Sequence, residues 1–136
     1  MYTAVQFVEN VDERTNIRRM CFKAIWPTAP RDFVACTTWT ERDDGSLMLC
    51  TRSAPDDVFP PQKGYVRGCI QISGYWIQPV DTLTGDAEAK KYPGGCKVTL
   101  TAHTELGGTL PASVINMLST AAPLKMMSAI SEIVKR

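Results

Sequence analysis

The pattern of apolar residues changes its period once, at Gly107-Gly108. Before this pair, residues 96–104 alternate apolar and polar side chains, as a strand with one buried face does. After it, from Pro111 to the end, apolar residues recur at three- and four-residue steps, which predicts one amphipathic helix. The recurring residues are Ile115, Leu118, Ala122, Met126, Ile130 and Ile133. The chain is therefore constrained to strands followed by one C-terminal helix.

The segments before this change are predicted to be antiparallel strands. They are rich in β-branched and aromatic residues and are bounded by Gly, Pro and Asp. The predicted strands cover residues 15–25, 31–41, 47–53, 65–72 and 74–79. Asp44-Gly45 predicts a tight hairpin turn, because glycine tolerates the positive φ that such turns require. The fold class is α+β, a curved antiparallel sheet packed on a long C-terminal helix, with room for a ligand cavity between them.

Composition excludes several classes of function. The formal net charge of +1 argues against a nucleic-acid-binding protein. No stretch approaches the roughly 18 apolar residues of a membrane-spanning helix, and the N-terminal residues do not resemble a secretory signal. The five cysteines are far apart and contain no Cys-x-x-Cys pair, which favours reduced thiols. We therefore expect a cytoplasmic protein.

The candidate catalytic residues do not assemble into a site. His103 is the only histidine and falls on the polar face of its strand. Arg31-Asp32 and Arg67 are interpreted as structural pairs at strand ends, because charged groups on sheets are mainly paired or solvated. A hydrolase needs a nucleophile, a base and an orienting group within reach of one another. We expect no enzymatic activity, no cofactor and no metal.

One segment carries a family signature. Residues 26–34, WPTAPRDFV, resemble the W-P-x-S-x-R-D-F-V signature of START (StAR-related lipid transfer) domains. Further matches follow in the family's order: Asp44-Gly45-Ser46, Arg52-Ser53, Tyr65-Val66-Arg67-Gly68, Ser73-Gly74-Tyr75, Cys96-Lys97-Val98-Thr99 and residues 107–114. The last segment most resembles the ceramide-transferring members. Because the resemblance begins near Val8, it implies a single partial START-like domain over residues 1–136, a helix-grip fold lacking the family's N-terminal helix and first strands.

The resemblance implies that the chain binds one apolar lipid (a sterol, ceramide, diacylglycerol or phospholipid) in an internal cavity and transfers it between membranes. The implied lining is Met20, Phe22, Ala35, Thr37, Leu49, Thr51, Val98 and Leu100. Family members with polar head-group sites carry glutamine, arginine and asparagine where this chain has Met20, Thr37 and Thr51. The lining is therefore mostly apolar and suits a lipid with a small polar head. The competing interpretation is that these side chains fill a solid core.

The resemblance also implies two mobile loops and a set of partners. Gly107, Gly108, Thr109 and Leu110 correspond to a lid before the last helix. Trp26 and Pro27 correspond to a membrane-contacting loop, and an indole ring favours the bilayer interface. The expected partners are a lipid ligand and, transiently, a membrane surface, which implies a cytoplasmic protein that is peripheral to membranes. Two alternatives stay open. One is a module acting through protein–protein contact, as a homodimer through an exposed sheet edge. The other is a helix-grip enzyme that uses Thr37, Thr51 and Arg18.

Overall fold

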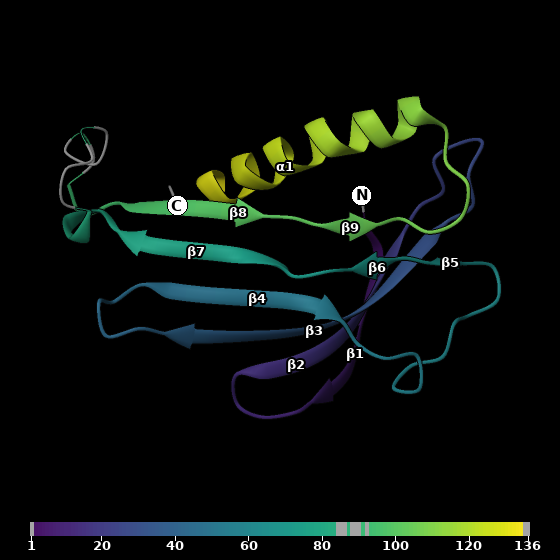
Figure 1. Ribbon diagram of the computed structural model, residues 1–136, viewed down its shortest axis with the longest axis horizontal. Coiled ribbons are helices and arrows are strands. Elements are labelled where there is room, and N and C mark those ends of the chain that lie inside the picture. Colours follow the sequence, from purple (N-terminus) through teal and green to yellow (C-terminus); the bar gives the residue numbers. More distant parts are fainter. Residues whose placement is uncertain (1, 84–86, 88–90, 92, 135–136) are drawn as a thin grey trace.

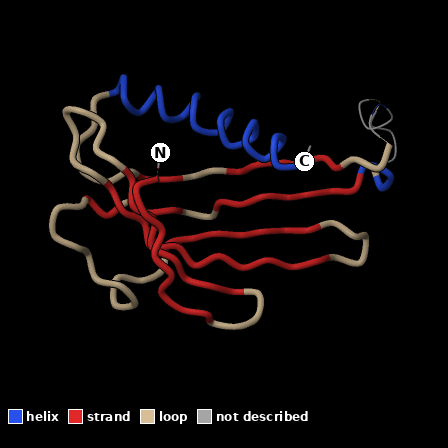
Figure 2. Tube along the Cα trace, turned by 180° about the vertical axis from the view of Figure 1, so that it is seen from behind, coloured by secondary structure: helices blue, strands red, loops and turns tan. Residues whose placement is uncertain are grey.

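The computed structural model describes residues 2–83, 87, 91 and 93–134. A curved antiparallel sheet forms the body of the molecule, and one long helix, α1 (Ala112–Val134), lies on one side of it (Figure 1). The same arrangement is seen from behind in Figure 2. The predicted fold class is confirmed in its main features.

The strands fall largely where the sequence predicts them. Their bounds are β1 Tyr2–Asn10, β2 Thr15–Phe22, β3 Arg31–Glu41, β4 Leu47–Ser53, β5 Val66–Arg67, β6 Cys69–Ile70, β7 Ser73–Pro79, β8 Cys96–Thr101 and β9 Thr104–Glu105. A short 3-10 helix, η1 (Val80–Thr82), follows β7. Gly45 has the positive φ, 75°, that the predicted β3–β4 hairpin requires. The predicted strand at residues 65–72 is two short strands instead.

The main sheet has the order β1-β2-β3-β4-β7-β8, and its neighbours along this path are antiparallel. β5 is the exception, because it pairs parallel to the start of β3. β6 and β9 form a separate two-stranded sheet. β1 was not predicted from the sequence. It pairs with β2, placing Val5 opposite Met20 and Phe7 opposite Arg18.

Part of the core lies on one face of the sheet, around Val34. Val34 is 1% exposed and packs with Ile17 and Ala54, and further apolar side chains surround this group. These are Val8, Cys36 and Phe59. Phe59 belongs to the proline-rich segment after β4, which therefore covers this face near β3. Burial of such side chains contributes roughly 1.5–3 kcal/mol each.

Helix α1 is less amphipathic than the sequence predicts. It continues past Pro123, and no described residue of it is fully buried. Leu118 and Ile130 are half-buried as expected, but the prediction is wrong for Ile115, Ala122, Met126 and Ile133, all of which are exposed. The reason is that α1 carries apolar side chains on several sides, so periodicity does not select one face. The described part of the chain contains no helix with the length and apolar character to cross a membrane.

Candidate functional site

The residues of the predicted cavity lie on one face of the main sheet. Directly paired residues of neighbouring strands point to the same face, as do residues two apart along a strand. Thr37 pairs with Thr51, Leu49 with Tyr75, and Tyr75 with Leu100. Through the same register this face, here called the inner face, holds Met20, Phe22, Ala35, Thr37, Leu49, Thr51, Val98 and Leu100. The structure therefore places all eight on one face of the sheet, spread over β2, β3, β4 and β8.

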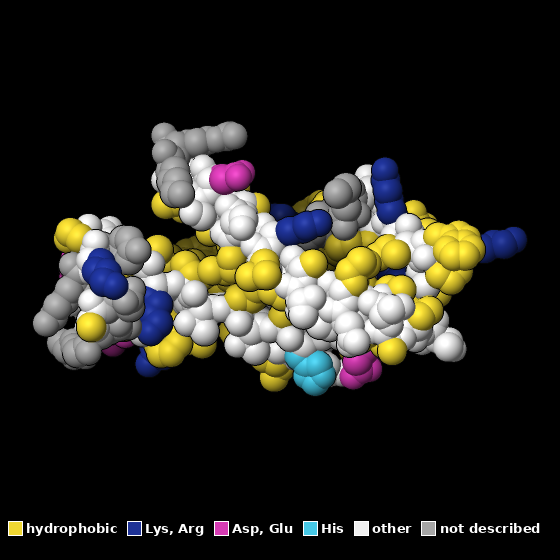
Figure 3. All heavy atoms as spheres, turned by 90° about the horizontal axis from the view of Figure 1, so that it is seen from above, with side chains coloured by type: hydrophobic (Ala, Val, Ile, Leu, Met, Phe, Trp, Pro, Cys, Tyr) yellow, Lys and Arg dark blue, Asp and Glu magenta, His cyan; other side chains and the backbone are white. Residues whose placement is uncertain are grey.

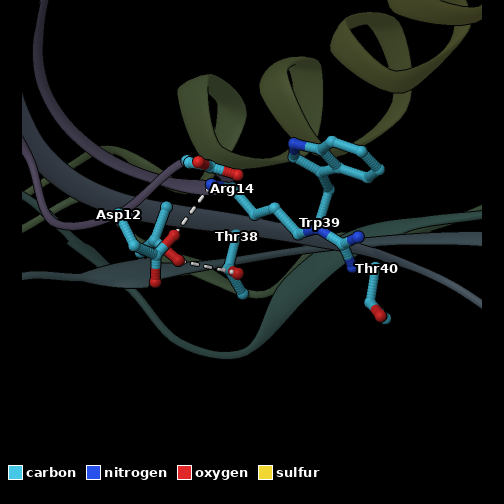
Figure 4. Close-up of a pocket in the computed structure, with 7 residues that line it drawn as sticks. Asp12, Arg14, Thr38, Trp39 and Thr40 are labelled. Carbon is cyan, nitrogen blue, oxygen red and sulfur yellow. Dashed lines mark hydrogen bonds between the residues drawn. The ribbon is translucent and has the colours of Figure 1, made fainter.

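The inner face is the side of the sheet on which α1 lies. Arg31 pairs with Phe22 and so projects from the inner face. Its Nε donates to the carbonyl oxygen of Leu106 at 3.3 Å, in the segment that leads into α1. Trp39, which pairs with Leu49, points toward the α1 side in the close-up (Figure 4). Seen from that side, the molecule displays apolar side chains along its middle (Figure 3).

The inner face is apolar and only partly covered. Of its eight predicted residues, Ala35 is buried and the other seven are half-buried. Phe22 and Phe33 meet edge to face with ring centroids 5.4 Å apart, a favourable aromatic geometry. Half-buried apolar side chains still have surface that an apolar ligand can cover, so they suit the lining of an apolar binding site.

A row of polar side chains crosses this apolar face. Register places Asn16, Thr37, Thr51 and Ser73 next to one another on β2, β3, β4 and β7. The hydroxyl oxygens of Thr37 and Thr51 are 3.0 Å apart and share a hydrogen bond. That bond uses one of their two protons, so the pair keeps one proton and several lone pairs for a ligand. Ser73 Oγ is engaged by the backbone of His103.

The end of the inner face near the β1–β2 turn is capped by a cation–π pair. The Arg14 guanidinium lies 5.0 Å from the centre of the Trp39 ring. A surface hollow of about 370 Å³ surrounds this pair (Figure 4). Its lining is Asp12, Glu13, Arg14, Thr15, Thr38, Trp39 and Thr40. A backbone hydrogen bond from Arg14 lowers the pKa of Asp12. A second hollow, of about 350 Å³, lies at the β3–β4 turn.

The opposite end carries the predicted lid and membrane-contact residues on two loops, here called the mouth loops, residues 23–30 and 106–111. Both loops lie at the same end of the molecule in Figures 1 and 2. Trp26 is 90% exposed, and its peptide bond to Pro27 is cis. Pro27 and Thr109 are exposed, and Leu110 is half-buried.

The two glycines of the second mouth loop are conformationally required. Gly107 and Gly108 have φ values of 65° and 63°, in the left-handed region that favours glycine. A Cβ on Gly107 would lie 2.6 Å from the carbonyl oxygen of Arg67, whereas one on Gly108 would make an ordinary contact with Val66. Gly107 therefore holds this loop against β5.

The predicted structural pairs are present, with one change of partner. Asp32 is 0% exposed and bonds Arg67 Nε at 2.9 Å and Arg19 Nε at 2.7 Å. Arg67 also pairs with Asp56 at 2.9 Å. Burial by itself would raise the pKa of Asp32, but the hydrogen bonds and charges of Arg67 and Arg19 outweigh it and lower that pKa. These groups lie on the outer face and are structural.

Arg19 and Arg31 differ from their sequence interpretation. The sequence does not predict a role for Arg19, yet its Nε donates to Asp32 Oδ2. Its guanidinium also lies 4.8 Å from the centre of the Tyr65 ring. The sequence feature that could have indicated this role is the position of Arg19 two residues before Cys21, which places both side chains on the same face of β2, where Cys21 is buried. Arg31 is not an ion-pair partner of Asp32 and bonds backbone carbonyls instead.

The residues considered for chemistry lie apart from one another. His103 is exposed and follows β8, away from the polar row except through its backbone. Arg18 is exposed and shares the inner face through its pairing with Ala35. Among the described residues, no group of three or more His, Cys, Asp or Glu side chains is placed to hold a metal ion.

Comparison with known proteins gives one consistent result. The START domain model matches residues 1–135, so the similarity extends to the N-terminal strand. The ceramide transfer protein of Mus musculus is 28% identical over 118 residues, which are 82% of this chain and 19% of that protein. The chain thus spans about a fifth of the length of this relative.

Solved structures agree on the fold. Human StAR-related lipid transfer protein 5 superposes with a TM-score of 0.80 at 20% identity, covering 98% of this chain and 60% of that one. A STAR-related lipid transfer protein fragment from Xanthomonas axonopodis gives a TM-score of 0.73 at 23% identity, covering 99% of this chain and 68% of that one.

Proposed function

The chain belongs to the START domain family, and from this premise we propose that it binds one apolar lipid on the inner face, beneath α1, and transfers it between membranes. The observation that carries the proposal is that the eight residues expected to line a cavity share one half-buried face. The proposed mechanism is extraction, shielding and release, with no bond made or broken.

The apolar lining supplies the driving force. Each Å² of apolar surface removed from water contributes roughly 25 cal/mol. Leu49, Tyr75 and Leu100 form a continuous apolar row across β4, β7 and β8, beginning at Trp39. This row and the aromatic pair Phe22–Phe33 lie on either side of the polar row, so a ligand with one central polar group matches both.

We propose an uncharged lipid with a small polar head, such as a sterol or a diacylglycerol-like molecule. None of the eight lining residues carries a charge. The Thr37–Thr51 pair offers one proton and free lone pairs, which suits one hydroxyl or carbonyl group. A charged head group buried beside it would lose hydration without gaining an ionic partner from these eight residues.

Transfer requires that the lipid enter and leave at a membrane surface. We propose that Trp26 and Pro27 contact the bilayer and that Gly107, Gly108, Thr109 and Leu110 act as the lid. The exposed indole of Trp26 suits the bilayer interface. The neighbouring mouth loop, with its two left-handed glycines, lies at the same end.

Native mass spectrometry of the purified chain after incubation with lipid vesicles tests the proposal. The expected spectrum shows one lipid bound per chain, with cholesterol or diacylglycerol favoured over phosphatidylserine. Absence of any lipid-bound species across these vesicles overturns it.

A second candidate function is contact with another copy of the chain. The sheet order places β1 and β8 outermost, and each has one strand neighbour in the described part of the chain. Outer strands are templates for pairing. Analytical ultracentrifugation distinguishes the two candidates, because the lipid-binding proposal needs only the monomer, whereas this one requires a stable dimer.

A further inference from the structure

We propose that Arg31 couples the two mouth loops, so that they open and close together and set the rate of lipid exchange. Only the claim about the rate of lipid exchange rests on the proposed function. The coupling itself is a property of the fold, and it can be tested without a ligand.

One guanidinium is bonded to both loops. Arg31 Nη1 donates to the carbonyl oxygen of Ala29, in the loop that carries Trp26. Arg31 Nε donates to the carbonyl oxygen of Leu106, immediately before Gly107. The planar fork of arginine presents several donors in fixed directions, so one side chain can hold two carbonyls that are far apart in sequence.

These two bonds hold a buried cation. The Arg31 residue is 8% exposed. Within the described residues, the ion pairs link Asp32 and Asp56 to other arginines, and none includes Arg31. A buried charge that loses a hydrogen-bond partner pays most of its desolvation cost. Moving one loop away from Arg31 alone is therefore unfavourable, and joint movement that admits water to the guanidinium is favoured.

The bases of the loops are fixed, which confines the movement to their tips. Val66 N–H donates to the carbonyl oxygen of Pro30 at 2.9 Å, at the end of the first loop. Gly107, in the second loop, packs against the carbonyl of Arg67. β5 thus anchors both loops, while the tips at Trp26 and Thr109 are exposed. The Arg31 bonds join the two loops beside these anchors, at Ala29 and Leu106, and so limit how far both tips can move.

The test compares Arg31→Met with Arg52→Met. Methionine keeps an unbranched stem but removes every donor. Arg52 is an exposed arginine on β4 whose partner Cys36 lies on the outer face, so its variant controls for loss of one positive charge. Arg31→Lys serves as a second variant, because it keeps the charge without the fork. Hydrogen–deuterium exchange is measured for the full chain without lipid, and release of a fluorescent sterol is measured by stopped flow.

In Arg31→Met, exchange is expected to rise in both mouth loops together, with β3 and β4 unchanged. Sterol association and release are both expected to accelerate at least about tenfold, the effect of losing hydrogen bonds to a charged group. Because both rates rise together, the dissociation constant changes little. General destabilisation of the fold does not raise both rates and leave the dissociation constant unchanged. Arg31→Lys should lie between the two, and Arg52→Met should match the unmodified chain.

Three results overturn the coupling: a rise in only one loop, no rise in either, or a rise throughout β3 and β4 as well. If hydrogen exchange rises in both loops but the rates of sterol association and release do not change, Arg31 does not control lipid exchange. If the unmodified chain binds no sterol but both loops still loosen together, the coupling stands and the lipid proposal fails for this ligand.

Discussion

Arg31 and Asp32 are neighbours on β3 that serve opposite faces of the sheet. Arg31 projects from the inner face and bonds the carbonyls of Ala29 and Leu106. Asp32 projects from the outer face and is enclosed by Arg19 and Arg67. One dipeptide therefore joins the mouth loops to the buried ionic cluster, because strand side chains alternate between faces.

The Asp32 cluster makes stability depend on pH in acid. The lowered pKa means that the folded state holds the carboxylate ionised more strongly than the unfolded chain does. This stabilisation is fully present above the unfolded-state pKa, about 3.9, and is lost as the pH falls toward the lower folded-state value. Asp32→Asn should cost about 3 kcal/mol at pH 7, because Arg19 loses its carboxylate partner and Arg67 keeps only the exposed Asp56.

Urea unfolding at pH 7 and at pH 3 measures both effects. The unmodified chain and an Asp57→Asn control, at an exposed position, should lose more stability between these pH values than Asp32→Asn does. Equal losses in all three proteins would show that Asp32 does not carry the acid sensitivity.

The two glycines of the second mouth loop should differ in their response to alanine. Gly108→Ala places a side chain at φ 63° with only an ordinary contact to Val66, so it should cost about 1 kcal/mol. Gly107→Ala meets the same backbone penalty and also the Arg67 carbonyl at 2.6 Å, so its cost should be larger. Thermal unfolding of the two variants gives the comparison. A larger loss at Gly108 would contradict the placement of this loop against β5.

The hydroxyl pair on the inner face should determine selectivity for the lipid head. Thr37→Val removes one hydroxyl while keeping the shape, so sterol affinity should fall about fivefold to tenfold, the effect of one hydrogen bond. The control is Thr38→Val, whose hydroxyl bonds Thr15 beside the hollow at the β1–β2 turn. Sterol titration followed by fluorescence measures both. Equal affinity in the two variants would remove Thr37 from ligand recognition.

The exposed tryptophan should act at the membrane and not in the fold. Trp26→Ala should reduce binding to vesicles severalfold, because the indole gains its energy at the bilayer interface. Its effect on unfolding should stay within about 0.5 kcal/mol, since the side chain is 90% exposed. Vesicle flotation and thermal unfolding check the two parts. Trp76→Ala, on the outer face, is the matched control, and an equal flotation loss in it would contradict the assignment.

The sequence predicts the strands well where turn residues bound segments rich in apolar and β-branched side chains. β3 and β4 have the expected bounds because two such segments flank the turn at Asp44-Gly45. β1 was missed because its pairing shifts register between Phe7 and Glu9, which breaks the alternation. The face of α1 was misassigned because its apolar residues surround the helix.

The candidate site, too, is predicted from the sequence only in part. Alternation together with the family resemblance places the eight residues of the inner face, since pairing register carries each face across the sheet. The Arg31–Leu106 bond joins residues 75 positions apart, so no local pattern predicts it. The pairing of Arg19 with Asp32 is likewise set by how β2 and β3 align, and not by the composition of either strand.

Photo-crosslinking with a sterol that carries a diazirine shows which face of the sheet holds the lipid, because β4 offers adjacent residues on opposite faces. Leu49 lies on the inner face, while its neighbour Met48 pairs with Trp76 on the outer face. Peptide mapping after irradiation should place one crosslink per chain on Leu49, Met20 or Leu100, with Met48 and Trp76 unlabelled. Labelling of Met48 and Trp76 at the level of Leu49 would contradict lipid binding on the inner face.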